Sequence, residues 1–236
     1  MPVLTLRSTT ETPGAWVQGA RESVLCAILL AMGVIPPSVA GNDWCAPASA
    51  LPWARHIPWQ ATAAALVFVA FWCLWSRRMH WTLPLAATLH GCVWVENADH
   101  IHHVWHLPVL LAWLEASPRL RLEGVRRATV GMWHTHAAIA KLQAHGLGWA
   151  DGHSMRVWVE AFAYPHVQAI TAWTPTWILA AGQWAALCVE AAGVLAVAWP
   201  RVCGLALVAF YALVIAAFPF GFATNMVLVW LYLVAR

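Results

Sequence analysis

The chain has 236 residues, of which 61% are hydrophobic and only 10% are charged, and its mean hydropathy is +0.64. This composition excludes a soluble globular domain and predicts an integral membrane protein, with length for about seven or eight spans of ~20 residues and none for a separate soluble domain. The net charge is +3 without any basic cluster interleaved with aromatic residues, so we expect the lipid bilayer and no nucleic acid as a partner. The predicted fold class is all-α, a polytopic membrane helical bundle.

Apolar runs separated by Arg, Pro or His clusters predict the membrane helices. In chain order the predicted spans are 23–39, 60–75, 81–95, 103–114, 125–145, 176–199, 202–218 and 222–234. The third and fourth are short, and we expect them to be tilted, re-entrant or kinked at Pro84 and Pro108. Residues 1–22 are predicted to be an N-terminal cytoplasmic segment, and residues 23–236 one transmembrane domain. An alternative for residues 1–40 is a cleaved signal peptide.

The arginines predict the orientation of this bundle. With eight crossings, ten of the twelve arginines fall on one side of the membrane, and only Arg55 and Arg156 fall on the other. By the positive-inside rule, the arginine-rich side and both termini are cytoplasmic. The outer side then holds the connections 40–59, 96–102 and 146–175.

Tryptophan and cysteine patterns fit a membrane bundle. Tryptophans near the ends of apolar runs are predicted to lie in the interfacial belts. These residues are Trp75, Trp81, Trp94, Trp177 and Trp199. The six cysteines are scattered and form no CxxC pair, so we expect buried thiols rather than a disulfide or metal framework.

Lys141 is the only lysine of the chain, and it lies in an apolar run near the outer end of a predicted span. An ammonium in low dielectric is costly, so a neutral amine or a specific partner is favoured there, which would supply a membrane site with a base. Helical spacing places His134 and His145 on the same face as Lys141. The alternative is that the Lys141 side chain extends to the outer interface.

Two further groups of polar residues are candidates for chemistry. Residues 96–106 concentrate imidazoles and carboxylates on the outer side, which predicts an acid/base cluster or a metal site, with a polar interfacial loop as the plainer alternative. The metal interpretation makes the chain a membrane metal or haem protein with ligands from His100, His102, His103 and His106, and from His134 or His136. Glu190 lies in the middle of an apolar run, so its carboxyl is either protonated, paired with a base such as Lys141, or directed to a polar cavity.

The segment around Lys141 resembles the vitamin K-dependent gamma-carboxylases and their bacterial relatives, the horizontally transferred transmembrane (HTTM) domain proteins. The resemblance is carried by Ala138-Ile139-Ala140-Lys141-Leu142 followed by Trp149-Ala150-Asp151-Gly152-His153-Ser154-Met155. Weaker similarity extends to the acidic segment around Glu190, to Phe210-Tyr211-Ala212, and upstream to Asn97-Ala98-Asp99-His100.

The resemblance implies a membrane enzyme of the bacterial inner membrane, with its site near the outer face. Lys141 would deprotonate a vitamin K-type hydroquinone or another quinol, His100 would assist the addition of carbon dioxide, and Glu190 would be the acidic catalytic residue. The reaction would be a carboxylation or an oxidation. The residues implied to bind substrate or cofactor are Asn97, Asp99, His134, His145, Trp149, Asp151 and Tyr211.

The sequence departs from this family at two places. It ends at Arg236 without the carboxylase's large lumenal region, and Tyr211 stands where the family has a histidine. We therefore expect a lipophilic small molecule, or a substrate held by a partner protein, rather than a peptide substrate bound by this chain alone. The alternative to an enzyme is a non-catalytic membrane subunit of a partner enzyme.

Overall fold

The computed structural model describes residues 15–34, 52–97, 103–117, 119–120, 122–219 and 222–235. Every regular element in these segments is helical, which confirms the all-α fold class. Within the described segments, four helices are long and apolar enough to cross a membrane. They are Trp16–Val34, Trp59–Ser76, Thr176–Val197 and Pro200–Ala217. The larger number of seven or eight spans stays a prediction.

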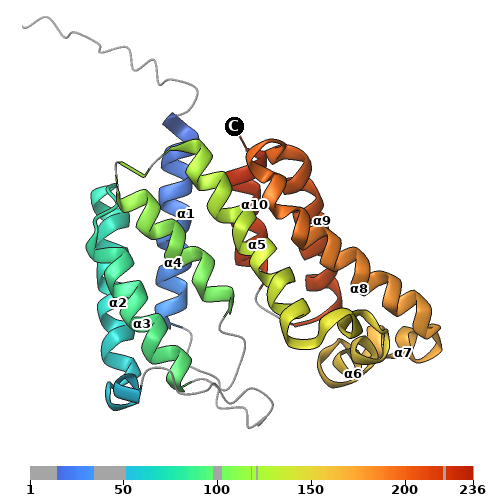
Figure 1. Ribbon diagram of the computed structural model, residues 1–236. Coiled ribbons are helices and arrows are strands. Elements are labelled where there is room, and N and C mark those ends of the chain that lie inside the picture. The colour runs from blue at the N-terminus through green and yellow to red at the C-terminus, as the bar shows by residue number, and fades with distance from the viewer. Residues whose placement is uncertain are drawn as a thin grey trace, which may run out of the picture.

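The helices follow one another as a chain of long and short elements (Figure 1). In order they are α1 (Ala15–Val34), η2 (Pro52–His56), α2 (Trp59–Ser76), α3 (Thr82–Asn97), α4 (His103–Ala116), α5 (Glu123–His145), η3 (Gly146–Ala150), α6 (His153–Phe162), α7 (Pro165–Trp173), α8 (Thr176–Ala191), η4 (Ala192–Val197), α9 (Pro200–Ala217), α10 (Ala223–Val229) and η5 (Trp230–Val234).

Three details differ from the sequence-based expectation. The first helix begins at Ala15 rather than at residue 23, because Arg21 and Glu22 find partners inside the protein and do not end it. Residues 146–175 are not a plain connection, since they contain η3, α6 and α7. Pro108 lies inside α4, whereas Pro84 lies in the first turn of α3, where its missing N–H costs no helical hydrogen bond.

The long helices alternate in direction (Figure 1). α1 to α4 pack together on one side, and α5, α8, α9 and α10 lie on the other, with α6 and α7 at the lower end. As a result the start of α1, the end of α2, the α4–α5 connection and the C-terminal helix meet at one end of the bundle. We call this the arginine-bearing end, because Arg21, Arg77, Arg78, Arg126 and Arg127 belong to these segments.

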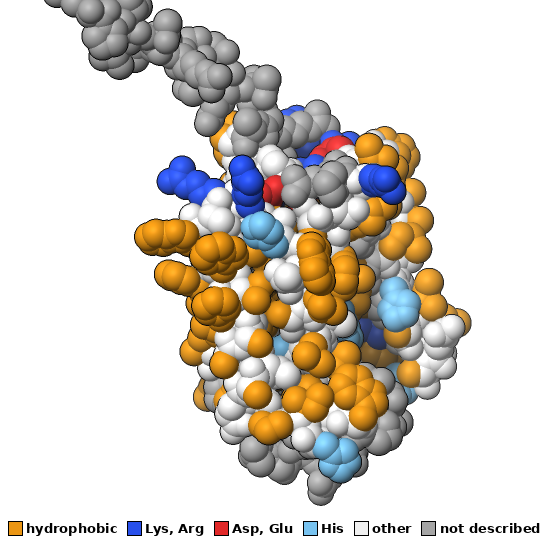
Figure 2. Space-filling model, turned by 90° about the vertical axis from the view of Figure 1, so that its left-hand side faces the viewer, with side chains coloured by type: hydrophobic (Ala, Val, Ile, Leu, Met, Phe, Trp, Pro, Cys, Tyr) orange, Lys and Arg blue, Asp and Glu red, His pale blue; other side chains and the backbone are white. Residues whose placement is uncertain are grey.

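The outer faces of the bundle are apolar, as Figure 2 shows for the side formed by α2 and α3, with charged side chains gathered at its upper end. Trp75, Trp81, Trp177 and Trp199 are exposed, as belt residues should be. Trp94 is not, since it is buried in the core, so its assignment to a belt was wrong. Three cysteines are buried as expected, whereas Cys188 is exposed on α8.

A buried ionic cluster joins four helices at the arginine-bearing end. The Glu115 carboxylate of α4 is completely buried and accepts hydrogen bonds from Arg126 of α5 at 2.7 and 2.9 Å, from Gln18 of α1 at 2.9 Å and from the Tyr232 hydroxyl at 2.9 Å. Beside it, Arg21 donates two hydrogen bonds to Glu123, at 2.8 and 3.1 Å, and one to a backbone carbonyl oxygen of η5. These partners satisfy the buried charges, which fixes how the helix ends meet.

Candidate active site

The candidate site depends on a close backbone approach between α5 and the α8–η4 segment. A Cβ atom at Gly131 would overlap with the carbonyl oxygen of Gly193, and one at Gly193 would overlap with the carbonyl oxygen of Gly131. The Thr135 hydroxyl donates across the same contact to the carbonyl oxygen of Ala191, at 3.2 Å. Small residues allow membrane helices to pack this closely, and here the packing holds the next turns of α5 and α8 within side-chain reach.

Lys141 and Glu190 meet across this interface. The Lys141 ammonium lies against both carboxylate oxygens of Glu190. The Glu190 side chain is only 8% exposed, whereas the Lys141 side chain is 28% exposed. The pair is therefore buried on the carboxylate side and partly open on the amine side.

The direction of the Lys141 side chain bears on its role. A helical side chain leans toward the N-terminus of its helix, so Lys141 leans away from the nearby end of α5. Its partner Glu190 lies in that direction, because the Glu190 carbonyl oxygen accepts a hydrogen bond from Thr135, which precedes Lys141 on α5. The alternative of a lysine that extends outward to the interface does not describe this conformation.

Trp149 covers the amine from the turn that follows α5. The Lys141 Nζ atom lies 5.0 Å from the centre of the Trp149 ring, within cation–π range. Gln183 of α8 holds this turn, because its side-chain amide donates to the Trp149 carbonyl oxygen at 2.8 Å and accepts from the backbone N–H of Gly152 at 2.8 Å. Gly152 has φ +78° and packs against Thr176, so a larger residue would be strained and crowded there.

A buried hydrogen-bonded chain lies deeper in the bundle, two turns before Lys141 on α5. His134 Nδ1 donates to the Val130 carbonyl oxygen at 2.7 Å, so Nε2 is free to accept from the Tyr211 hydroxyl at 2.8 Å. Asn225 of α10 is buried as well, and its side-chain carbonyl oxygen accepts no hydrogen bond from the described residues.

The remaining predicted residues do not join this arrangement. His145 is exposed at the end of α5. Asp151 accepts hydrogen bonds from the backbone N–H and the hydroxyl of Ser154, both at 2.9 Å, and these bonds hold the pKa of its carboxyl below the usual range. Asp151 thus stabilises the start of α6.

The histidine-rich segment falls largely outside the described residues. Asp99, His100 and His102 lie outside them, and the side chains of Asn97 and His103 do as well. His106 is described, and its ring packs edge-on against Trp133, with 5.3 Å between ring centres. The described part of the chain contains no group of three or more His, Cys, Asp or Glu side chains placed to hold a metal ion.

Sequence reasoning missed Gln183, Asn225 and the Gly131–Gly193 contact. Gln183 lies seven residues before Glu190 on one helical face of an otherwise apolar span, a spacing that marks both as inward-facing. Asn225 had a similar signal, as a lone amide in an apolar run.

No family model matches the chain, and no curated protein or solved structure matches it either.

Proposed function

We propose that the chain is an integral membrane enzyme in which Lys141 acts as a base on the hydroxyl group of a quinol or a similar lipophilic phenol. The observation that carries this proposal is the Lys141–Glu190 pair, an amine and a carboxyl held in contact between membrane helices. The resemblance of the Lys141 and Trp149–Met155 segments to the vitamin K-dependent gamma-carboxylases supports the substrate class.

Glu190 gives the amine a route to its neutral form. A carboxylate in contact with an ammonium favours the protonated amine, so Lys141 becomes a base when its proton moves to Glu190. This transfer replaces a partly exposed ammonium and a buried carboxylate with a neutral amine and a carboxylic acid, and a medium of low polarity favours that exchange. The amine nitrogen then takes the proton of the phenolic hydroxyl and leaves a phenolate beside the new ammonium.

The surroundings of Lys141 suit a lipophilic ring. Leu147 is an exposed apolar side chain of η3, and the Trp149 ring lies over the amine. These two residues would hold the ring, while Lys141 faces its hydroxyl group. A bound quinol would supply the acidic hydroxyl and the redox chemistry that the side chains lack.

His134 and Tyr211 have a structural role in this proposal, and neither of them acts as a second base. The two side chains hydrogen bond to each other, and His134 is also fixed by the Val130 carbonyl oxygen. They therefore set the packing beside Lys141 and Glu190. In this proposal His100 remains the residue that would assist a carboxylation, and oxidation of the quinol is the alternative reaction.

We place the protein in a bacterial inner membrane with both termini cytoplasmic and Lys141 toward the outer face. The distribution of the arginines supports this orientation. Single cysteines introduced at Asp151 and at Arg119, in protein whose exposed Cys188 is replaced by serine, test it. A membrane-impermeant maleimide added to intact cells should label position 151 and not position 119, and labelling of both positions from outside would contradict the orientation.

Binding of reduced menaquinone-4 to the detergent-purified protein under anaerobic conditions tests the base. The wild-type protein should bind the hydroquinone and show the absorbance of its phenolate. Lys141→Ala should lose the phenolate signal while expressing normally, and Lys141→Arg should lose it too, because a guanidinium does not release its proton. Glu160→Gln, on the exposed face of α6, should leave the signal unchanged. A wild-type signal in Lys141→Arg would exclude Lys141 as the base.

A further inference from the structure

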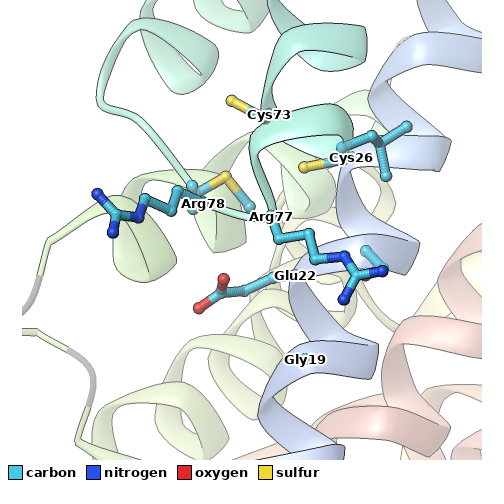
Figure 3. A pocket seen from close by; sticks show the side chains of 9 residues that line it. Gly19, Glu22, Cys26, Cys73, Arg77 and Arg78 are labelled. Carbon is cyan, nitrogen blue, oxygen red and sulfur yellow. The ribbon is translucent and has the colours of Figure 1, made fainter. Parts of the chain in front are cut away.

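A cavity of about 400 Å³ opens between α1 and α2 at the arginine-bearing end, whereas Lys141 lies near the other end of α5. Figure 3 shows that Cys26 of α1 and Cys73 of α2 enter it from facing helices. Arg77 and Arg78, at the end of α2, line the same cavity together with Glu22. Two thiols and two arginine side chains thus line one small space, and the Arg77 and Arg78 side chains extend to opposite sides of it.

The two thiols are neighbours. Cys26 and Cys73 line this one cavity from adjacent helices, and both are free cysteines. Cys73 lies in the last turns of α2, four residues before Arg77, so it is the thiol nearer in sequence to the arginines. Positive charge favours the thiolate, which is the form that attacks a disulfide, and Cys73 is therefore the attacking thiol of the pair.

The entrance to the cavity carries positive charge. Arg77 and Arg78 are exposed, and with the Glu22 carboxylate, which accepts a hydrogen bond from the Gln18 amide at 2.6 Å, the lining carries two positive charges and one negative charge. Arg77 has φ +50°, a left-handed conformation that ends α2 and turns the chain at this point. Two cations at the mouth of a small cavity attract anionic molecules from water.

We propose that Cys26 and Cys73 form a redox-active dithiol that exchanges with small anionic disulfides admitted between Arg77 and Arg78. The Cys73 thiolate attacks one sulfur of the disulfide, which forms a mixed disulfide and releases one thiolate. Cys26 loses its proton and attacks the Cys73 sulfur, which forms the Cys26–Cys73 disulfide and releases the second thiolate. The dithiol is oxidised and the small disulfide is reduced to two thiols. The reverse reaction restores the dithiol, so the surrounding thiol pool sets the state of the α1–α2 link.

The test uses the full-length protein in detergent micelles and three small disulfides. Anionic oxidised glutathione, neutral bis(2-hydroxyethyl) disulfide and cationic cystamine are compared at equal concentrations, and the products are mapped by peptide mass spectrometry. We expect a peptide pair joined through Cys26 and Cys73, formed fastest with oxidised glutathione. Cys188, on the exposed face of α8, is the internal reference and should form only mixed disulfides.

Cysteine variants test the thiol exchange, and arginine variants test the selection of anionic disulfides. Cys26→Ala should trap a glutathione mixed disulfide on Cys73, and Cys73→Ala should leave Cys26 unmodified. Arg77→Asn with Arg78→Gln should slow the reaction with oxidised glutathione about tenfold and should not slow the reaction with cystamine. Asparagine is chosen at position 77 because it tolerates positive φ.

Two results would overturn the proposal. If Cys26 and Cys73 stay reduced while Cys188 reacts in the same folded sample, the pair is not redox-active. If cross-linking is as fast with cystamine as with oxidised glutathione, the arginines do not select the disulfide. Gel filtration and circular dichroism of each variant establish that it is folded.

Discussion

The buried Glu115–Arg126 pair should contribute a large part of the free energy of unfolding, and replacing one partner tests this prediction. Glu115→Gln keeps the shape of the side chain but leaves the Arg126 guanidinium, whose side chain is 7% exposed, without its main counter-charge. Removing one partner of a buried ion pair costs about 3–5 kcal/mol. Glu123 remains 3.5 Å from Arg126, so we expect the lower end of that range.

The assay is thermal unfolding in detergent, followed by the intrinsic fluorescence of the 18 tryptophans. A loss of about 3 kcal/mol corresponds to a fall in Tm of roughly 6–12 °C for a chain of this size. Glu160→Gln is the matched control, since the exposed Glu160 side chain should contribute less than about 0.5 kcal/mol. A double replacement, Glu115→Leu with Arg126→Met, should recover most of the loss, because an apolar pair of similar volume leaves no unpaired charge.

The reasoning is refuted in either of two ways. A Tm for Glu115→Gln within about 2 °C of wild type would mean that the buried pair contributes less than about 1 kcal/mol. A double variant as unstable as the single one would mean that the shape of these side chains, rather than their charge, holds the helix ends together.

Two more predictions follow from the packing and from the surface charges. Gly131→Ala should destabilise the protein strongly, since a Cβ there meets the carbonyl oxygen of Gly193. Gly182→Ala is the control, because Gly182 has open space around it, and this variant should be neutral or slightly stabilising. Equal Tm values for the two variants would contradict the close approach of the two backbones. Burial alone would raise the pKa of the Glu123 carboxyl, but the Arg21 guanidinium outweighs this effect and the pKa is lowered in the folded protein. Stability from Glu123 is therefore present above the unfolded pKa and is lost as the pH falls through the folded pKa. Thermal melts across this acidic range should show a smaller pH dependence for Glu123→Gln than for wild type, and an equal pH dependence would count against the Arg21 contact.

Composition and periodicity predicted the helical class and most helix positions, because apolar runs and the residues that interrupt them are features of the local sequence. The start of α1 could not be read in this way, since Arg21 and Glu22 look like the end of an apolar run unless their distant partners are known. The helices within 146–175 could not be predicted locally either, because hydrogen bonds from Gln183 and contacts with α8 hold them in place.

The main residues of the candidate site could be predicted from the sequence, but the way in which they meet could not. The rarity of lysine singled out Lys141, and a mid-span carboxyl singled out Glu190, with their pairing as one of several alternatives. The Gly131–Gly193 contact, which brings the two side chains together, needs the three-dimensional structure. The contact of Tyr211 with His134 also depends on η4, which packs against both α5 and α9, and the local sequence does not reveal this arrangement.

The position of Lys141 along α5 has an electrical consequence. It lies four residues before the last residue of the helix, a rise of about 6 Å in a helix about 35 Å long. In the proposed topology, in which α5 crosses the membrane, a proton that reaches Lys141 from that end crosses roughly a fifth of the bilayer, so a potential of about 100 mV adds or removes only about 0.5 kcal/mol. The proposed chemistry at Lys141, supplied from this side, would then run at nearly the same rate in energised and de-energised membranes.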